Sequence, residues 1–117
     1  MKVRTKVWIE DDHGKVVFGG GREHMLEAID RLGSMNKAAK ELKMSYRALW
    51  GRIKSTENRM GAKVLTTRPG GGKGSGSILT PIGKRFLENY RRLSHRIIEQ
   101  ADREFDKIFG DTRIDEE

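Results

Sequence analysis

Hydrogen-bond donors and aromatic side chains are concentrated in one short stretch near the middle of the chain. The outward-facing candidates in it are Ser45, Tyr46, Arg47, Trp50, Gly51, Arg52, Lys54 and Ser55. Arg47 and Arg52 can each donate two parallel hydrogen bonds, either to a guanine edge or to a phosphate. Tyr46 and Trp50 suit apolar contact with thymine methyl groups, or packing half-buried under a neighbouring element. These residue types indicate recognition of a polyanion.

Positive charge is concentrated in the same part of the chain. The net charge of the 117 residues is +7. Residues 34–79 hold ten Lys or Arg and two acids, which gives +8, whereas residues 80–117 hold eight basic and nine acidic residues. Such a field favours nucleic acid, because contact with phosphates releases condensed counterions. The alternative is a basic face that is merely solvated.

The sequence has no residue pattern typical of a catalytic or metal-binding site. The chain has no cysteine, its carboxylates are scattered, and His13, His24 and His95 lie in unrelated segments without ligand spacing. Gly72-Lys73 is followed by Gly74, so it does not complete a nucleotide-binding P-loop. We therefore expect no enzyme, no cofactor and no metal.

The length and the N-terminal residues limit the number of domains and the location that we expect. A chain of 117 residues is long enough for one domain with its own core. The first residues, MKVRTKVWIEDD, lack the apolar run of a signal peptide, and no stretch approaches 18 apolar residues. We expect a cytoplasmic, nucleoid-associated protein with no membrane partner.

The N-terminal residues are expected to form a hairpin and then a helix. Alternating residues from Val3 to Ile9 predict a strand, and the turn at 11–14 predicts its return through residues 16–18. A hairpin over residues 2–18 is the result. Apolar spacing then predicts a helix over 22–32, which Gly33 ends.

A pair of short helices carries the central stretch. Ser34 is placed to cap the first helix and Ser45 to cap the second, with an elbow at Lys43-Met44. The residues expected to point inward are Met35, Ala38, Ala39 and Leu42, and then Ala48, Leu49, Ile53 and Met60. Ser34, Asn36 and Lys37 lie at the first helix's start, where free N–H groups and the helix dipole favour phosphate.

A glycine-rich loop lies between two short strands. Residues 64–67 and 77–79 can pair across PGGGKGSGS. A loop that becomes ordered only on binding can bring backbone N–H groups and Lys73 close to phosphates, with Arg68 at its root. An inert linker is the alternative reading, although the position between two pairing strands argues against it.

One long helix is expected after Thr80-Pro81, because no helix breaker occurs until Gly110. Its apolar stripe includes Ile82 and Ala101 and the residues that we expect to mediate self-association, namely Phe86, Tyr90, Leu93, Ile97, Phe105 and Ile108. The alternative is a helix that packs on its own domain for half its length and then frays.

This order of elements is that of a winged helix-turn-helix, in which the third helix enters the major groove and the wing lies along the backbone or minor groove. The fold class expected is mainly α with a small β component. The expected division is a DNA-binding domain over 1–79 (hairpin 2–18, helix-turn-helix 34–60, wing 64–79), a dimerisation helix over 80–109 and a flexible tail over 110–117.

Two stretches, GSMNKAAKELKMSYRALWGRIKSTENRMGAKVL and LTPIGKRFL, resemble the DNA-binding domain of LysR-type regulators. The segment SYRALW, the wing TTRPGGGKGSGS and the strands before the first helix more closely resemble the N-terminal domain of the molybdate-responsive ModE regulators. The resemblance implies a homodimer that binds double-stranded DNA at a palindrome. The motif-matched residues that it implies for DNA are Ser34, Ser45, Tyr46, Arg47, Trp50, Arg68 and Lys73.

ModE regulators carry C-terminal oxyanion-binding domains, and this sequence ends at Glu117. We therefore expect a stand-alone DNA-binding regulator, or one that acts beside a separate oxyanion-sensing or regulatory protein. Arg52 and Lys54 complete the residues predicted to contact DNA. The competing hypotheses are a non-specific architectural or RNA-binding protein that uses the same basic surface, and an interaction module that works through its long helix.

Overall fold

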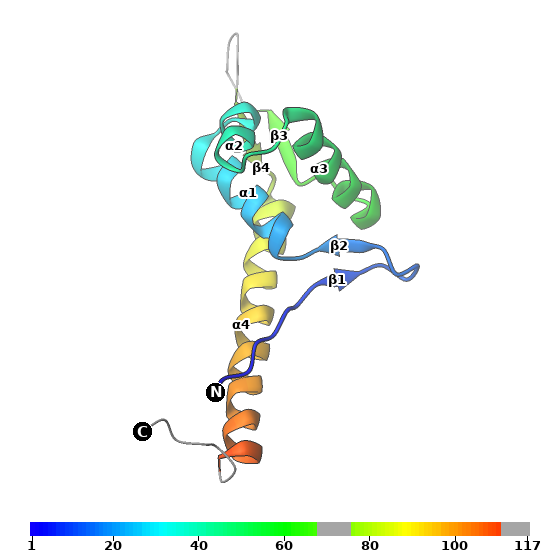
Figure 1. The fold of residues 1–117 in the computed structure, drawn as a ribbon. Helices are drawn as coiled ribbons and strands as arrows, with labels where there is room; N and C mark the ends of the chain where they lie inside the picture. The colour runs from blue at the N-terminus through cyan, green and yellow to red at the C-terminus, as the bar shows by residue number, and fades with distance from the viewer. Residues whose placement is uncertain (68–75, 111–117) are drawn as a thin grey trace.

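Four helices and two small hairpins make up the structure, which is a computed structural model that describes residues 1–67 and 76–110 (Figure 1). The elements in chain order are β1 (Ile9–Glu10), β2 (Val16–Phe18), α1 (Gly20–Leu32), α2 (Met35–Glu41), α3 (Tyr46–Met60), β3 (Leu65–Thr67), β4 (Ser77–Leu79) and α4 (Pro81–Phe109). The strands pair β1 with β2 and β3 with β4, both antiparallel. This mainly α winged helix-turn-helix confirms the expected fold class.

The helix boundaries follow local sequence signals. The Ser34 hydroxyl accepts a hydrogen bond from the Lys37 N–H at 3.2 Å, and the Ser45 hydroxyl accepts one from Ala48 at 3.0 Å. These are the caps expected for α2 and α3. Gly33 and Gly61 end α1 and α3 in the left-handed conformation, with φ of 67° and 72°.

The core lies where α1, α2, α3 and the start of α4 meet. Its fully buried large side chains are Phe18, Leu26, Ile29, Leu49, Val64 and Thr56. The ring of Phe18 lies 5.0 Å from that of Phe86 and 4.9 Å from that of Tyr90, between ring centroids. The N-terminal hairpin and the last helix therefore share one aromatic centre.

One of the inward positions predicted on α3 is wrong. Ala48 is exposed, whereas Leu49 and Ile53 are buried as expected, together with the polar Thr56 and Glu57. The error arose because the apolar pattern ignores polar residues that find buried partners. The Thr56 hydroxyl donates to the carbonyl of Val17 at 2.9 Å, so its burial leaves no unsatisfied donor.

The beginning of the long helix also differs from the expected stripe. Ile82 is exposed, and the residues that α4 buries in its first turns are Gly83, Leu87 and Tyr90. Gly83 lies against the backbone of Val64, which leaves no room for a side chain at that position. The helix therefore approaches the wing root through a glycine, and the buried face is set by that contact.

The N-terminal strand pairs over fewer residues than expected. Val3, Thr5, Val7 and Ile9 are half-buried and the residues between them are exposed, as the alternation predicted. Only Ile9 and Glu10 pair with β2, however, and the preceding residues run beside α4 (Figure 1). The Tyr90 hydroxyl donates to the Val7 carbonyl at 2.7 Å, which fastens this N-terminal arm, residues 1–8, to the long helix.

Candidate nucleic-acid interface

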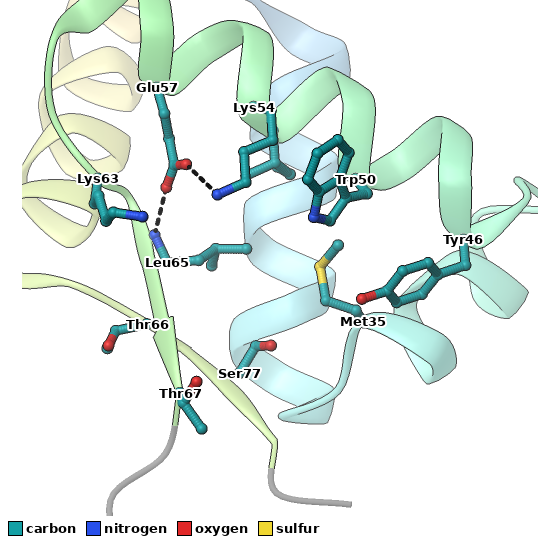
Figure 2. A pocket seen from close by; sticks show the side chains of 11 residues that line it. Met35, Tyr46, Trp50, Lys54, Glu57, Lys63, Leu65, Thr66, Thr67 and Ser77 are labelled. Carbon is teal, nitrogen blue, oxygen red and sulfur yellow. Dashed lines mark hydrogen bonds and ion pairs between the residues drawn. The ribbon is translucent and has the colours of Figure 1, made fainter.

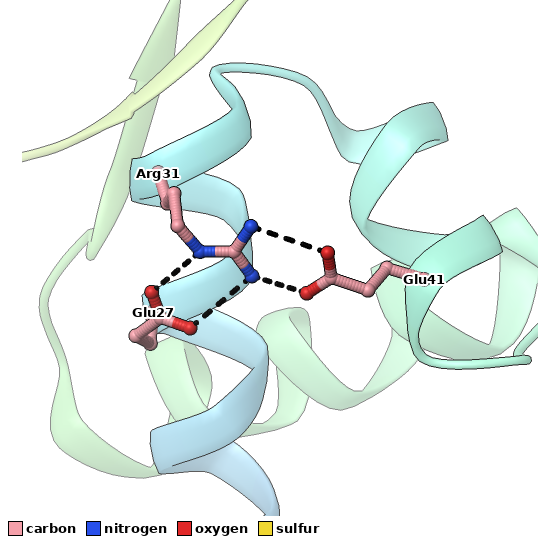
Figure 3. Close-up of polar contacts among 3 residues, drawn as sticks. All are labelled: Glu27, Arg31 and Glu41. Carbon is pink, nitrogen blue, oxygen red and sulfur yellow. Dashed lines mark hydrogen bonds and ion pairs between the residues drawn. The ribbon is translucent and has the colours of Figure 1, made fainter.

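A tight elbow places α3 across α2. Lys43, in the elbow, has a φ of 57°, a left-handed conformation that lets the chain reverse direction. Ala38 and Ala39 are buried at the junction, where their small side chains permit close helix packing. An ion-pair network ties the end of α2 to α1: Arg31 on α1 donates to Glu27 at 2.9 Å and to both carboxylate oxygens of Glu41 at the end of α2 (Figure 3).

The outer face of α3 lies opposite its buried residues. At 100° per residue, the positions furthest from the buried Leu49, Ile53, Thr56 and Glu57 are occupied by Arg47, Gly51, Ser55 and Asn58. We call these four residues the outer face. A methyl group added at Gly51 would meet nothing within 4 Å. No element of the described chain therefore covers the helix at Gly51, and a partner molecule can approach the helix backbone closely.

The wing-facing side of α3 carries the two aromatic residues. Tyr46 and Trp50 are each 48% exposed. They line a cleft of about 440 Å³ between α3 and strands β3 and β4, with Met35 at its base (Figure 2). Trp50 is thus neither in the core nor fully exposed, and its indole faces an open cleft beside the wing.

Lys54 is the residue whose predicted role in DNA contact fits the structure least. Its ammonium lies 3.2 Å from a carboxylate oxygen of Glu57 and 5.6 Å from the centre of the Trp50 ring (Figure 2). The charge is therefore neutralised within the protein, where the ammonium lies over the face of the indole.

Glu57 joins α3 to the wing. Its second carboxylate oxygen accepts hydrogen bonds from the N–H groups of Val64 at 2.8 Å and Leu65 at 3.3 Å. Burial opposes ionisation of this carboxyl group. The two N–H groups and the ammonium of Lys54 outweigh that effect, so the pKa of Glu57 lies below its ordinary value. An ionised Glu57 thus fixes the angle between α3 and β3.

The other predicted DNA contacts lie at the starts of α2 and α3, further along α3, or outside the described residues. Asn36 and Lys37 are exposed at the start of α2, while the hydroxyls of Ser34 and Ser45 are used as helix caps. Arg52 is exposed on the side of α3 away from the wing. Arg68 and Lys73 lie outside the described residues.

The predicted dimerisation residues divide into two groups. Tyr90 is buried and Phe86 half-buried, and both rings pack on Phe18 of their own chain, which removes them from the exposed stripe. Further along α4, large apolar side chains are exposed, and these are Leu93, Ile97, Ile98, Ile108 and Phe109. Phe105 is half-buried against Phe109, with ring centroids 5.1 Å apart.

Two groups of residues were missed by the sequence reasoning. Glu57 and Thr56 are polar, and only their distant partners reveal their roles. Arg22 and Arg59 were not assigned to any site, although the structure brings Arg22 of α1 near both Arg52 and Arg59 of α3. Within residues 1–67 and 76–110, no cluster of side chains suited to a metal ion occurs, and no helix there has the length and apolar character needed to span a membrane.

The arrangement of α2, α3 and the β3–β4 hairpin defines a winged helix-turn-helix protein. Residues 24–84 match the family model of the bacterial regulatory helix-turn-helix proteins of the LysR family, which is more than half of the chain. The chain belongs to this family.

Curated relatives point to a narrower group within this fold. The chain is 44% identical over 73 residues to the molybdenum transport protein ModE of Azotobacter vinelandii and 40% identical over 73 residues to the molybdenum-pterin-binding protein MopB of Rhodobacter capsulatus. It is 34% identical over 74 residues to the DNA-binding transcriptional dual regulator ModE of Escherichia coli K12. Each alignment covers 62% of this chain and 27% or 28% of the relative.

Solved structures agree with the fold. The crystal structure of the CbnR DBD–DNA complex has a TM-score of 0.52 and 29% identity, and the match covers 79% of this chain and 97% of that one. CbnR, a LysR family transcriptional regulator, has a TM-score of 0.53 and 27% identity over 73% of this chain and 28% of its own.

Proposed function

We propose that this chain is a homodimeric transcriptional regulator that binds double-stranded DNA sequence-specifically, with α3 in the major groove. The observation that supports this most strongly is the uncovered outer face of α3. Arg47 and Asn58 are exposed there, and Gly51 between them has open space where a side chain would be. An arginine beside a close backbone approach suits bidentate hydrogen bonding to a base edge.

Charge and relatives support DNA as the partner. Residues 34–79, which include α3, carry a net charge of +8, and such a charge favours binding through phosphate contacts. One relative is named as a DNA-binding dual regulator, and a similar structure is a complex with DNA. The wing, on the side of α3 that carries Tyr46 and Trp50, is then placed to contact the flanking backbone or minor groove.

Self-association is proposed through the far half of α4. Leu93, Ile97 and Ile98 are exposed on a helix that extends beyond the core of its own domain (Figure 1). Burying such a stripe against a second copy removes apolar surface from water, worth roughly 25 cal/mol per Å². The division that we propose is a DNA-binding unit over residues 1–79 and a dimerisation helix over 80–109.

Selection of bound sequences from random duplexes tests the DNA proposal. The wild-type protein should prefer its selected sequence over random duplex by about 10³-fold or more at physiological salt. Arg47→Ala should weaken binding to the selected duplex by about 1–3 kcal/mol, while Arg92→Ala, an exposed arginine on α4, should not. A wild-type protein that binds all duplexes equally, or prefers RNA, would instead be an architectural or RNA-binding protein.

Light scattering tests the dimer. Ile97→Glu places a charge on the exposed stripe, where Ile97 is 37% exposed, and should shift the protein from dimer to monomer. Ile82→Glu is the matched control, because Ile82 is 45% exposed at the start of the same helix and outside the far half. A wild-type monomer at all concentrations would refute the proposed dimer and leave the DNA proposal intact.

A further inference from the structure

Three arginines from two helices gather on the side of α3 that faces away from the wing. Arg52 and Arg59 are seven residues apart, two turns, and therefore lie on one side of the helix. Arg22, in the first turn of α1, donates to the hydroxyl of Thr56 at 3.2 Å, and Thr56 lies between them on α3. We call Arg22, Arg52 and Arg59 the arginine cluster.

The cluster is held in place by the N-terminal hairpin. The Thr56 hydroxyl that accepts from Arg22 donates in turn to the carbonyl of Val17 at 2.9 Å. Arg59 donates to the carbonyl of Val16, the neighbouring residue of β2. Two of the three guanidinium groups are thus oriented by the backbone and hydroxyl groups around them, while Arg52 is exposed beside them.

The three cluster arginines form no ion pair with an acid in the described part of the chain. Arg31, Arg91 and Lys54 each form an ion pair with a glutamate, but none of the three cluster arginines does. Burial lowers the pKa of Arg22, and the nearby charges of Arg52 and Arg59 lower it further. Neighbouring cations repel one another at this spot.

Asp11 is an acid near Arg59, but the two side chains form no ion pair. Its Oδ1 accepts hydrogen bonds from the N–H groups of His13 at 2.8 Å and Lys15 at 3.0 Å within its own turn. These bonds, above all the one from Lys15, lower the pKa of the Asp11 carboxyl group, and the charge of Arg59 adds to the effect. With no ion pair inside the described chain, the cluster can bind an external anion. Arginine suits a tetrahedral oxyanion because its planar fork donates in parallel to two oxygens.

We infer that the arginine cluster binds a phosphodiester group of the DNA backbone, on the opposite side of α3 from the wing. This inference rests on the proposed function, and it assigns Arg52 to phosphate and not to a guanine edge. The protein then contacts the duplex on both sides of the groove that α3 enters. The β3–β4 wing lies on one side, and the arginine cluster, held by the β1–β2 hairpin, lies on the other. Phosphate contacts of this kind set affinity and register without reading sequence.

The test compares Arg52→Gln, Arg52→Lys and the control Arg92→Gln by fluorescence anisotropy with the selected duplex and with a random duplex. Arg52 was chosen because it is exposed and makes none of the hydrogen bonds that hold Arg22 and Arg59. Arg52→Gln should weaken binding to both duplexes by the same factor. With a salt slope of about −0.9 for each phosphate contact, its deficit should be about threefold larger at 50 mM than at 200 mM salt. Arg52→Lys should retain most of the affinity, because lysine serves phosphate as a point charge.

Three results would overturn the inference. If Arg52→Gln and Arg52→Lys both lose affinity for the selected duplex alone, Arg52 contacts a base and not a phosphate. A deficit no larger than that of Arg92→Gln would remove the phosphate contact. Thermal unfolding in inorganic phosphate and in chloride gives a further comparison. If Arg52→Gln keeps its duplex affinity but loses the stabilisation that phosphate gives the wild type, the cluster binds a free oxyanion instead of DNA. A wild-type protein that binds no duplex would instead refute the proposed function itself.

Discussion

Two glycines inside helices lie in opposite surroundings, and the same substitution should affect them in opposite ways. A Cβ atom at Gly51 on α3 would meet nothing within 4 Å. A Cβ atom at Gly83 on α4 would lie 2.5 Å from the Val64 carbonyl oxygen and 3.1 Å from the Val64 Cα. Backbone atoms cannot move aside as the end of a side chain can, so Gly83 is a packing requirement and Gly51 is not.

The magnitudes depend on helix propensity and overpacking. Gly51→Ala should raise the free energy of unfolding by about 0.8–1 kcal/mol, the usual gain of alanine over glycine in a helix interior. Gly83→Ala should lower it, because forcing a methyl group into a packed site costs about 1–3 kcal/mol and the gain in propensity is smaller near a helix terminus. If α3 enters a groove by its outer face, the same methyl at Gly51 intrudes on the duplex and should weaken binding by about tenfold, or 1.4 kcal/mol.

Urea unfolding followed by circular dichroism and anisotropy titration with the selected duplex would measure both effects. Gly51→Ala should move the urea midpoint upward at constant slope while the affinity falls. More stable protein with unchanged affinity would refute the position of the outer face against DNA. A stabilised Gly83→Ala variant would refute the close approach of α4 to Val64.

Three further variants test the elements that support the interface. Glu57→Gln should lower the free energy of unfolding by roughly 1–3 kcal/mol at neutral pH. Because the pKa of Glu57 is depressed in the folded state, its contribution is present above its ordinary pKa of 4.5 and is lost as the pH falls through the folded value. Urea titrations from pH 7 to pH 3 should therefore show the difference between wild type and variant shrinking in acid. Tyr90→Phe, which leaves the carbonyl of Val7 without its donor, should cost about 0.5–1.5 kcal/mol by the same assay, and Ser45→Ala should cost about 1 kcal/mol through loss of the cap on the Ala48 N–H.

The parts of the fold that were predictable depend on neighbours in sequence. Ser34, Ser45 and Thr80 cap helices through groups three residues away, and Gly33 and Gly61 end helices at their own positions. Such signals operate within one turn, so the amino-acid sequence alone predicts the approximate bounds of the helices and the order of the elements. The winged helix-turn-helix fold was inferred from that order.

The errors and omissions concern contacts between distant residues. Thr56 bonds a carbonyl 39 positions earlier, and nothing in the local apolar pattern reveals that partner. Tyr90 was placed on the dimer face because it continues the helical stripe, yet its hydroxyl and ring are used inside the domain. The same holds for charged residues. The sequence presents Lys54 as a free positive charge, and only the structure shows that it pairs with Glu57.

The hydrogen bond between Tyr90 and Val7 has a consequence for the order of folding. Its two residues are 83 positions apart, so the N-terminal arm cannot be fastened until α4 has formed and the long intervening segment has closed. During synthesis the arm is made before its partner on α4, and its alternating apolar side chains stay exposed to other chains in the meantime. The arm is therefore open to non-native contacts for as long as the synthesis and folding of α4 take.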